Sequence, residues 1–203
     1  MGLLQGMNLF NPRWSGKLRR TYLNVDYSIV LSKKEVQELS VAEIYSRISQ
    51  ALDYDEVAFQ KSHMHPVRSN HKAEEIGHAL FVCPQCEAID SFEANQNEFG
   101  CKNCDYTLVI NAFGFYELKS GAKLFFDNIR DWYNWQEGWL LNFVATKYDI
   151  LNDDEVILED KGSAIYYGNT GNEIHFVGKG DLRLYRNRIE ILYQGEHETV
   201  ELN

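Results

Sequence analysis

The sequence predicts an α+β fold: a helical segment, then a four-cysteine zinc ribbon, then a small antiparallel β-rich segment. Two CxxC pairs, Cys83 with Cys86 and Cys101 with Cys104, are separated by fourteen residues. This insert is slightly shorter than the roughly 15–20 residues usual between such pairs, but it fits a short hairpin. Ahead of the cysteines, apolar residues recur with the period of a helix face, and beyond residue 151 short β-forming runs alternate with turn residues.

These patterns divide the chain into five segments. We expect a basic segment with a docking strand (1–31), a helical region (32–80), the zinc ribbon (81–118), an aromatic helix (119–150) and an incomplete β-rich segment (151–203). At 203 residues the chain has room for one sizeable domain or for two or three small ones.

Hydropathy and charge exclude two classes of function. No apolar run approaches the roughly 18 residues that a membrane-spanning helix needs. The net charge is −10, and the first twenty residues contain four bases and no acid, which leaves 16 bases against 30 acids in the rest. Because so acidic a body repels phosphate groups, we expect no nucleic-acid partner.

The first segment contains a basic run followed by a strand. Arg13, Lys17, Arg19 and Arg20 predict peripheral contact with an anionic membrane, where each base contributes about 1 kcal/mol. The alternative is a solvated loop or a broken-off piece of a larger domain. Residues 22–31 alternate apolar with polar side chains and therefore predict a strand. Because this strand has no sequential neighbour, we expect it to pair with the sheet of another domain.

The helical region begins with two capping boxes. Ser32 precedes Glu35, and Ser40 precedes Glu43, each at the spacing at which the serine and glutamate cap one another's backbone N–H groups. The second box opens a helix whose apolar residues form one stripe: Val41, Ile44, Tyr45, Ile48 and Leu52.

Four histidines follow this helix: His63, His65, His71 and His78. A helix over residues 70–80 would place His71 and His78 on one face, where the pair could bind a ligand. Histidines at such positions are more often solvated or bonded to nearby backbone groups. We therefore expect none of them to be catalytic.

The four cysteines predict a structural metal site. In each CxxC pair, two-residue spacing lets both thiolates turn toward one point, and two pairs complete a tetrahedron with Zn–S bonds of about 2.3 Å. We expect zinc, with iron in a rubredoxin-like site or two disulfides as alternatives. Disulfides are disfavoured because the start of the chain lacks a signal-peptide pattern. Four protein thiolates leave no position for water or substrate, so we expect no catalysis at the metal.

Strands are expected on both sides of the cysteine pairs, at residues 79–82 and 106–110. Beyond them, Trp132, Trp135 and Trp139 lie on one face of a predicted helix, which either packs on the ribbon or stacks against a ligand. The final segment predicts a small barrel or sandwich with short strands at residues 155–158, 163–167, 173–177, 181–185 and 189–193. A further run at 199–202 stops in mid-strand, so the segment is expected to be incomplete.

The order of these motifs resembles the C-terminal half of bacterial 1-acyl-sn-glycerol-3-phosphate acyltransferases that carry a zinc ribbon after the catalytic domain. The resemblance covers about residues 10–140. It is carried by Pro12-Arg13-Trp14, Val25-Asp26-Tyr27, Leu39-Ser-Val-Ala-Glu-Ile44, Leu52-Asp-Tyr-Asp-Glu56, both CxxC pairs, Phe113-Gly-Phe115 and Trp132-Tyr-Asn-Trp-Gln136.

The chain lacks the catalytic motifs of that family. The resemblance implies a His-x-x-x-x-Asp box, whose His acts as general base, and a Phe-Pro-Glu-Gly-Thr-Arg segment that holds the phosphate. No histidine here has Asp five residues later, and no Pro-Glu-Gly-Thr occurs. The resemblance therefore implies a non-catalytic accessory portion of a glycerophospholipid-synthesising enzyme, partnered with the catalytic domain and located in the cytoplasm or at the inner face of the membrane. The alternative is a free-standing zinc-ribbon adaptor that binds another protein.

Overall fold

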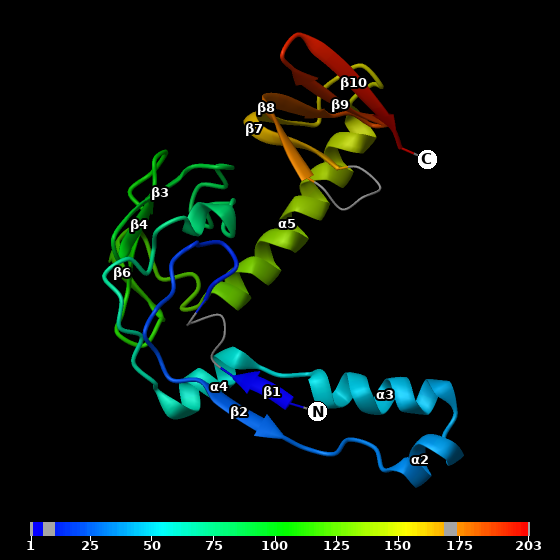
Figure 1. Cartoon of the computed structure of the whole chain (residues 1–203). Helices are drawn as coiled ribbons and strands as arrows, with labels where there is room; N and C mark the ends of the chain where they lie inside the picture. Colours follow the sequence, from blue (N-terminus) through cyan, green and yellow to red (C-terminus); the bar gives the residue numbers. More distant parts are fainter. Residues whose placement is uncertain (1, 6–10, 169–173, 203) are drawn as a thin grey trace. The chain divides into compact units, whose positions relative to one another are not determined.

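The computed structural model describes residues 2–5, 11–168 and 174–202 and has a mixed α+β fold (Figure 1). It divides into two compact units, residues 1–136 and 137–203. A helical segment and one four-stranded antiparallel sheet belong to the first unit, and a second four-stranded antiparallel sheet belongs to the second. The predicted fold class is therefore confirmed.

The first unit opens with a two-stranded antiparallel sheet. Strand β1 (Gly2–Gln5) pairs with β2 (Asn24–Tyr27), so that Gly2 lies opposite Tyr27 and Gln5 opposite Asn24. The expectation that the strand within residues 22–31 has no partner in this chain was therefore wrong. The partner strand was missed because no strand was predicted within residues 1–20, where β1 lies.

Three helices follow: α2 (Lys33–Glu38), α3 (Val41–Leu52) and α4 (Glu56–His63). Both predicted capping boxes are confirmed. The Ser40 hydroxyl accepts from the N–H of Glu43, and the Glu43 carboxylate accepts from the N–H of Ser40 at 2.8 Å; Ser32 and Glu35 repeat the pattern. Helix α3 contains no buried residue. Of its predicted apolar stripe, Ile44 is half-buried and the other four residues are exposed to solvent.

The ribbon is an antiparallel sheet in the order β3-β4-β5-β6. Its strands are β3 (Phe92–Asn95), β4 (Glu98–Cys101), β5 (Thr107–Ile110) and β6 (Tyr116–Ser120). The strand predicted at 106–110 corresponds to β5. The strand predicted at 79–82 is not formed, and only an isolated bridge joins Val82 to Ile89. Of the helix considered over 70–80, only the short 3₁₀ helix η1 (Ile76–His78) is present, preceded by Glu75 in the left-handed conformation (φ 63°).

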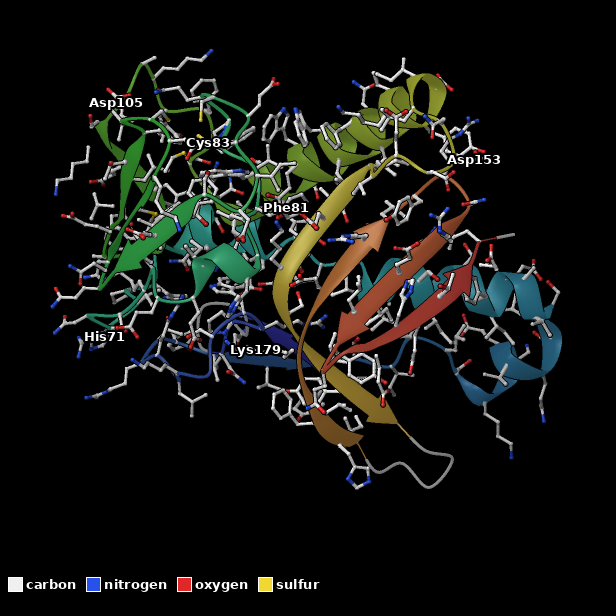
Figure 2. All side chains as sticks on the ribbon, turned by 90° about the horizontal axis from the view of Figure 1, so that it is seen from above. His71, Phe81, Cys83, Asp105, Asp153 and Lys179 are labelled. Atoms are coloured by element: carbon white, nitrogen blue, oxygen red, sulfur yellow. The ribbon has the colours of Figure 1, made fainter. Side chains whose placement is uncertain are left out.

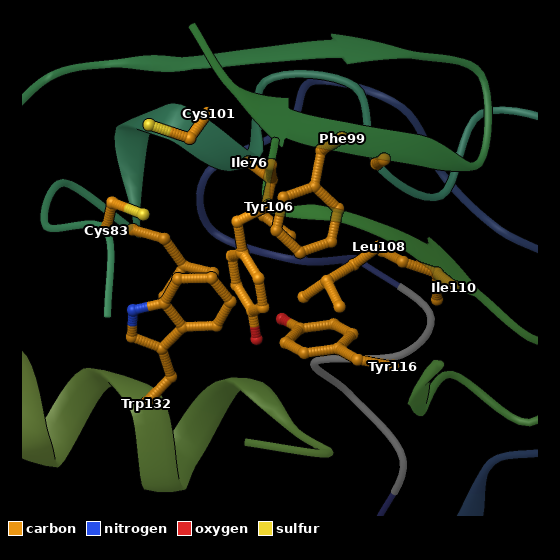
Figure 3. Close-up of a cluster of buried hydrophobic side chains, with 11 residues drawn as sticks. Ile76, Cys83, Phe99, Cys101, Tyr106, Leu108, Ile110, Tyr116 and Trp132 are labelled. Carbon is orange, nitrogen blue, oxygen red and sulfur yellow. The ribbon is translucent and has the colours of Figure 1, made fainter. Parts of the chain in front are cut away.

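The core of the first unit lies between the ribbon and the start of α5 (Ile129–Ile150). Trp132 is fully buried, and its indole lies against the rings of Phe99, Tyr106 and Tyr116 with centroid separations of 5.9–6.1 Å (Figure 3). Trp135 is half-buried beside the same cluster. Trp132 and Trp135, two of the three tryptophans on the predicted helix face, therefore pack on the ribbon.

The second unit is built around one meander in the order β10-β9-β8-β7. Its strands are β7 (Leu158–Gly168), β8 (Ile174–Leu184), β9 (Arg188–Tyr193) and β10 (Glu196–Glu201). The expectation of a barrel or sandwich of shorter strands was wrong for the part of this segment that the structure describes.

Predicted turns in this segment are absorbed into long strands. Lys161 and Gly162 form an irregularity in the β7–β8 register, where the Gly162 N–H donates to Asp181 at 3.0 Å. Gly180 lies within β8, and only glycine fits there because a Cβ would lie 2.5 Å from the carbonyl oxygen of Leu192 on the neighbouring strand. Between β9 and β10, Gln194 and Gly195 both have positive φ, as a two-residue type I′ hairpin turn requires.

Candidate metal centre

The structure brings the four cysteines together at one end of the ribbon. Cys83 and Cys86 lie in the turn before β3, Cys101 ends β4, and Cys104 lies in the loop that leads to β5. The Sγ atoms of Cys83 and Cys104 are 3.8 Å apart, those of Cys86 and Cys101 are 3.6 Å apart, and all four lie within 4.8 Å of one another. Sulfur atoms gather beside Cys83 in Figure 2, and Figure 3 shows the side chains of Cys83 and Cys101 above Trp132.

This spacing fits a tetrahedral metal site. Four sulfurs at about 2.3 Å from a central ion lie about 3.8 Å from each other. A disulfide would instead place two sulfurs about 2.05 Å apart, and all four cysteines are free in this structure. The cluster can therefore hold a metal ion, and four sulfur ligands suit either zinc or iron.

The two cysteine turns repeat one backbone pattern. The N–H of Cys83 donates to the carbonyl of Ala88 at 3.0 Å, and the N–H of Cys101 donates to the carbonyl of Tyr106 at 2.9 Å, five residues on in each case. In the first turn, Glu87 has φ 58°, the left-handed conformation that glycine adopts most easily. Glutamate at this position therefore does not prevent a regular turn.

Hydrogen bonds to sulfur favour the thiolate form on one side of the cluster. Burial raises the pKa of the Cys101 thiol, but hydrogen bonds with Ser91, the Asn103 N–H, Cys86 and the Cys104 N–H together outweigh it and lower this pKa to about 7. Burial dominates at Cys83 and Cys104 and raises the pKa of both thiols. A bound cation would offset that cost, because metals bind cysteine as the thiolate.

Gln85 connects the two cysteine turns. Its side-chain amide donates to the Asp105 carboxylate at 2.8 Å, and its oxygen accepts from the N–H of Ala122 at 2.8 Å. Gly121 lies against this contact, since a Cβ there would be 2.8 Å from both the Gln85 oxygen and the Tyr106 ring. These contacts hold the loop after β6 against the cluster.

The sequence identified Gln136 only as the end of the Trp132-Tyr-Asn-Trp-Gln136 motif and did not indicate its structural role. Gln136 is fully buried on α5. Its oxygen accepts from the N–H of Phe81 at 2.9 Å, and its amide donates to the carbonyl of Ala79 at 2.6 Å. These bonds satisfy the backbone at residues 79–82 in place of the predicted strand. A glutamine within an otherwise aromatic helix face was the available signal.

The histidines do not assemble into a ligand set in the described parts of the chain, where the four cysteines form the metal-type cluster. His63 and His65 stack with ring centroids 5.4 Å apart, and Phe59 and Tyr22 extend the stack on either side. His71 pairs with Glu74, well away from Cys83 (Figure 2).

Three of the four N-terminal bases are exposed. Arg13, Lys17 and Arg20 reach solvent, and Lys17 forms an ion pair with Glu74. Arg19 is only 6 % exposed, which corrects the expectation that it reaches a membrane surface. A basic run in the sequence does not show which of its members folds inward.

Comparisons with protein-family models, curated proteins and solved structures give no match to this chain. They do not identify it as part of an acyltransferase. Among the residues described, no helix combines the length and the apolar character needed to cross a membrane.

Proposed function

We propose that this chain is a non-catalytic accessory part of a glycerophospholipid-synthesising acyltransferase, built around a structural zinc ion. The observation that carries the structural role is the closed cluster of Cys83, Cys86, Cys101 and Cys104, whose sulfurs lie within 4.8 Å of one another. With all four tetrahedral positions taken by protein sulfur, the ion has no open site for water or substrate. Zinc would then supply folding free energy to the ribbon.

The accessory role is supported by the order of the motifs and by an exposed apolar face. On α3, Val41, Tyr45 and Leu52 are 85 %, 74 % and 55 % exposed and belong to one apolar stripe of the helix. Exposed apolar side chains that share one face of a helix are typical of surfaces that another protein covers. In this proposal the partner is the catalytic domain.

A free-standing adaptor is the second candidate, and the pairing of β1 with β2 favours it. The strand expected to dock on a catalytic domain already has a partner within this chain. The same exposed face on α3 would then bind an unrelated protein.

The native gene product decides between the two. An antibody raised against this chain isolates the native protein, whose mass and acyl transfer to lysophosphatidate from acyl-CoA or acyl-carrier protein are measured. We expect the native protein, alone or with a copurified subunit, to transfer acyl groups, and the 203-residue chain alone to transfer none.

A matched pair of variants in the native gene tests the role of the ribbon. Cys101→Ser should lower the transferase activity, whereas the exposed neighbour Lys102→Ser should not. Native protein with neither acyl transfer nor an acyltransferase subunit would refute the accessory role and support the adaptor.

A further inference from the structure

A cavity of about 280 Å³ lies within the first unit, away from the cysteine cluster. It is bounded by the N-terminal segment, α4, the β5–β6 connection and the first turn of α5. Its apolar wall includes Trp14, Val57, Ile76, Ile110, Phe113 and Ile129. The volume is near the lower end of the range for small-molecule sites, roughly 300–1,000 Å³.

Two buried cations line this cavity. Arg19 and Lys72 are each 6 % exposed. The Arg19 guanidinium donates to the carbonyl of Lys72 at 2.7 Å, and the Lys72 ammonium donates to the carbonyl of Ser69 at 2.9 Å. In the described parts of the chain, neither cation forms an ion pair with a carboxylate, whereas Arg130 at the same cavity pairs with Asp55.

Such an arrangement is costly for the protein alone. Burial lowers the pKa of both Arg19 and Lys72, and the charge of Arg19 lowers that of Lys72 further. Buried charges in proteins are normally compensated by an opposite charge. Arg19 and Lys72 are held by neutral carbonyls, and Arg19 also by the Trp14 ring at 5.9 Å. The cavity residue Asp55 is paired with Arg130. Two like charges without an ion-pair partner at one cavity therefore point to an anion from outside the chain.

Polar atoms on the cavity residues have no hydrogen-bond partner among the described residues. They are the indole nitrogen of Trp14, Nε of Arg19 and the side-chain oxygen of Gln60. The orientation of the Gln60 amide is fixed, because its nitrogen donates to the carbonyls of His65 at 2.6 Å and Phe113 at 2.8 Å. These three groups belong to residues that line the cavity, and buried polar groups left without partners are uncommon in folded proteins.

We propose that this cavity binds a small organic anion. A carboxylate or phosphate group lies between Arg19 and Lys72, which form charge-assisted hydrogen bonds with its oxygens. An apolar or aromatic body lies against Ile76, Ile110 and Phe113. The proposal does not depend on the acyltransferase assignment, because it rests on this cavity alone.

The first test compares four probes on the metal-loaded chain: phenyl phosphate, benzoate, inorganic phosphate and neutral benzyl alcohol. The readout is the indole N–H resonance of Trp14, assigned with Trp14→Phe. We expect phenyl phosphate or benzoate to shift it saturably, with a dissociation constant of about 1 mM or lower, and benzyl alcohol to have no effect. Inorganic phosphate binding as tightly as phenyl phosphate would refute the apolar part of the site. No saturable shift with any anion would refute the proposal and leave a water-filled cavity.

The second test removes each cation. Arg19→Met and Lys72→Met should each weaken binding of the better anion about tenfold or more, as expected for the loss of a charge-assisted hydrogen bond. Arg20→Met, an exposed neighbour, is the control and should bind normally. Equal weakening in Arg20→Met would show a non-specific charge effect and refute the site. If one cavity variant does not fold, the other variant and the probe comparison decide.

Discussion

The indole N–H of Trp132 donates a 3.0 Å hydrogen bond to the carbonyl oxygen of Val82, the residue immediately before the first cysteine of the cluster. Gln136, one turn further along α5, bonds the backbone at Phe81 and Ala79. Three side-chain hydrogen bonds from one helix therefore hold the segment that enters the first cysteine turn. Because these groups are buried, the metal centre and the start of α5 should fold together.

Metal binding is the first prediction. We expect one zinc ion per chain in protein purified under reducing conditions, and loss of that ion in Cys101→Ser. Removal of the metal should unfold the ribbon and expose Trp132, because binding free energy in such sites is folding free energy, with apparent values of roughly 10–16 kcal/mol in small zinc peptides. Metal analysis and tryptophan fluorescence measure both effects, with Lys102→Ser as the matched control.

The second unit should keep its structure in Cys101→Ser, because its sheet contains residues from 158 onward only. Amide exchange on β8 and β9 tests this.

The metal-binding prediction has its own contrary outcome. Less than about half an equivalent of metal in the wild-type chain would contradict binding with the free energy expected for a structural zinc site.

Gln136→Leu is the second prediction. Leucine fills a similar volume but leaves the Phe81 N–H and the Ala79 carbonyl without partners. Each buried unsatisfied group costs about 1–3 kcal/mol, so for the two groups we expect a loss of about 2–6 kcal/mol in the free energy of unfolding. Urea denaturation of the metal-loaded protein measures it. The exposed neighbour Glu137→Leu should change stability little, and equal losses in the two variants would show that the buried contacts of Gln136 are unimportant.

Local sequence signals predicted local structure well. The Ser40–Glu43 capping box was predicted because both partners lie within one helical turn. The clustering of the cysteines was also predictable, since two CxxC pairs joined by a short hairpin have few other arrangements. In both cases the determining residues are close together in the sequence.

Non-local structure was predicted poorly. The pairing of β1 with β2 joins segments about twenty residues apart. The alternation of apolar and polar side chains in β2 predicts a strand but does not identify the strand that pairs with it. Arg19 and Lys72 lie at one cavity although 53 residues separate them. Gly162 falls between two predicted strands, 155–158 and 163–167, and was therefore expected in a turn. It lies instead within β7, where its N–H donates to Asp181 in the next strand. In each case the local structure depends on a contact with a residue distant in the sequence, and the sequence pattern does not identify that residue.

Ser40→Ala is the third prediction. The cap hydroxyl accepts from the Glu43 N–H, and its loss costs about 1 kcal/mol of helix stability. Because α3 contains no buried residue, the effect should appear as faster amide exchange in α3 and not in global unfolding. Ser46→Ala, on the same helix but outside the cap, is the control. Unchanged exchange in Ser40→Ala would mean that the cap does not limit fraying of α3.

Acid should weaken the same cap. Hydrogen bonds from the side chain and then the backbone of Ser40 lower the pKa of the Glu43 carboxyl. A carboxyl with a lowered folded-state pKa stabilises the fold above its unfolded pKa, and this contribution is lost as the pH falls through the folded pKa. Amide exchange of α3 should therefore change with pH less steeply in Glu43→Gln than in wild type below about pH 4.3, after correction for intrinsic exchange. Parallel pH profiles would contradict this.

The pH dependence of stability should reveal Lys72. Burial, and then the charge of Arg19, lowers the pKa of its ammonium group from 10.5. Between the lowered folded pKa and the unfolded value, the unfolded chain binds more protons than the folded chain. The contribution of Lys72 therefore makes the fold more stable as the pH rises through this window.

Without an anion bound, Lys72→Met should be more stable than wild type near pH 7, and the difference should shrink toward pH 10.5. Other groups on the cavity, including Arg19, Tyr54, Asp55, Glu56, Tyr116 and Arg130, are common to both proteins, so the difference isolates Lys72. Denaturant unfolding at several pH values measures it, with exposed Lys33→Met as the control. A stability difference between Lys72→Met and wild type that is constant from pH 7 to 10.5 would show that Lys72 titrates as an ordinary surface lysine.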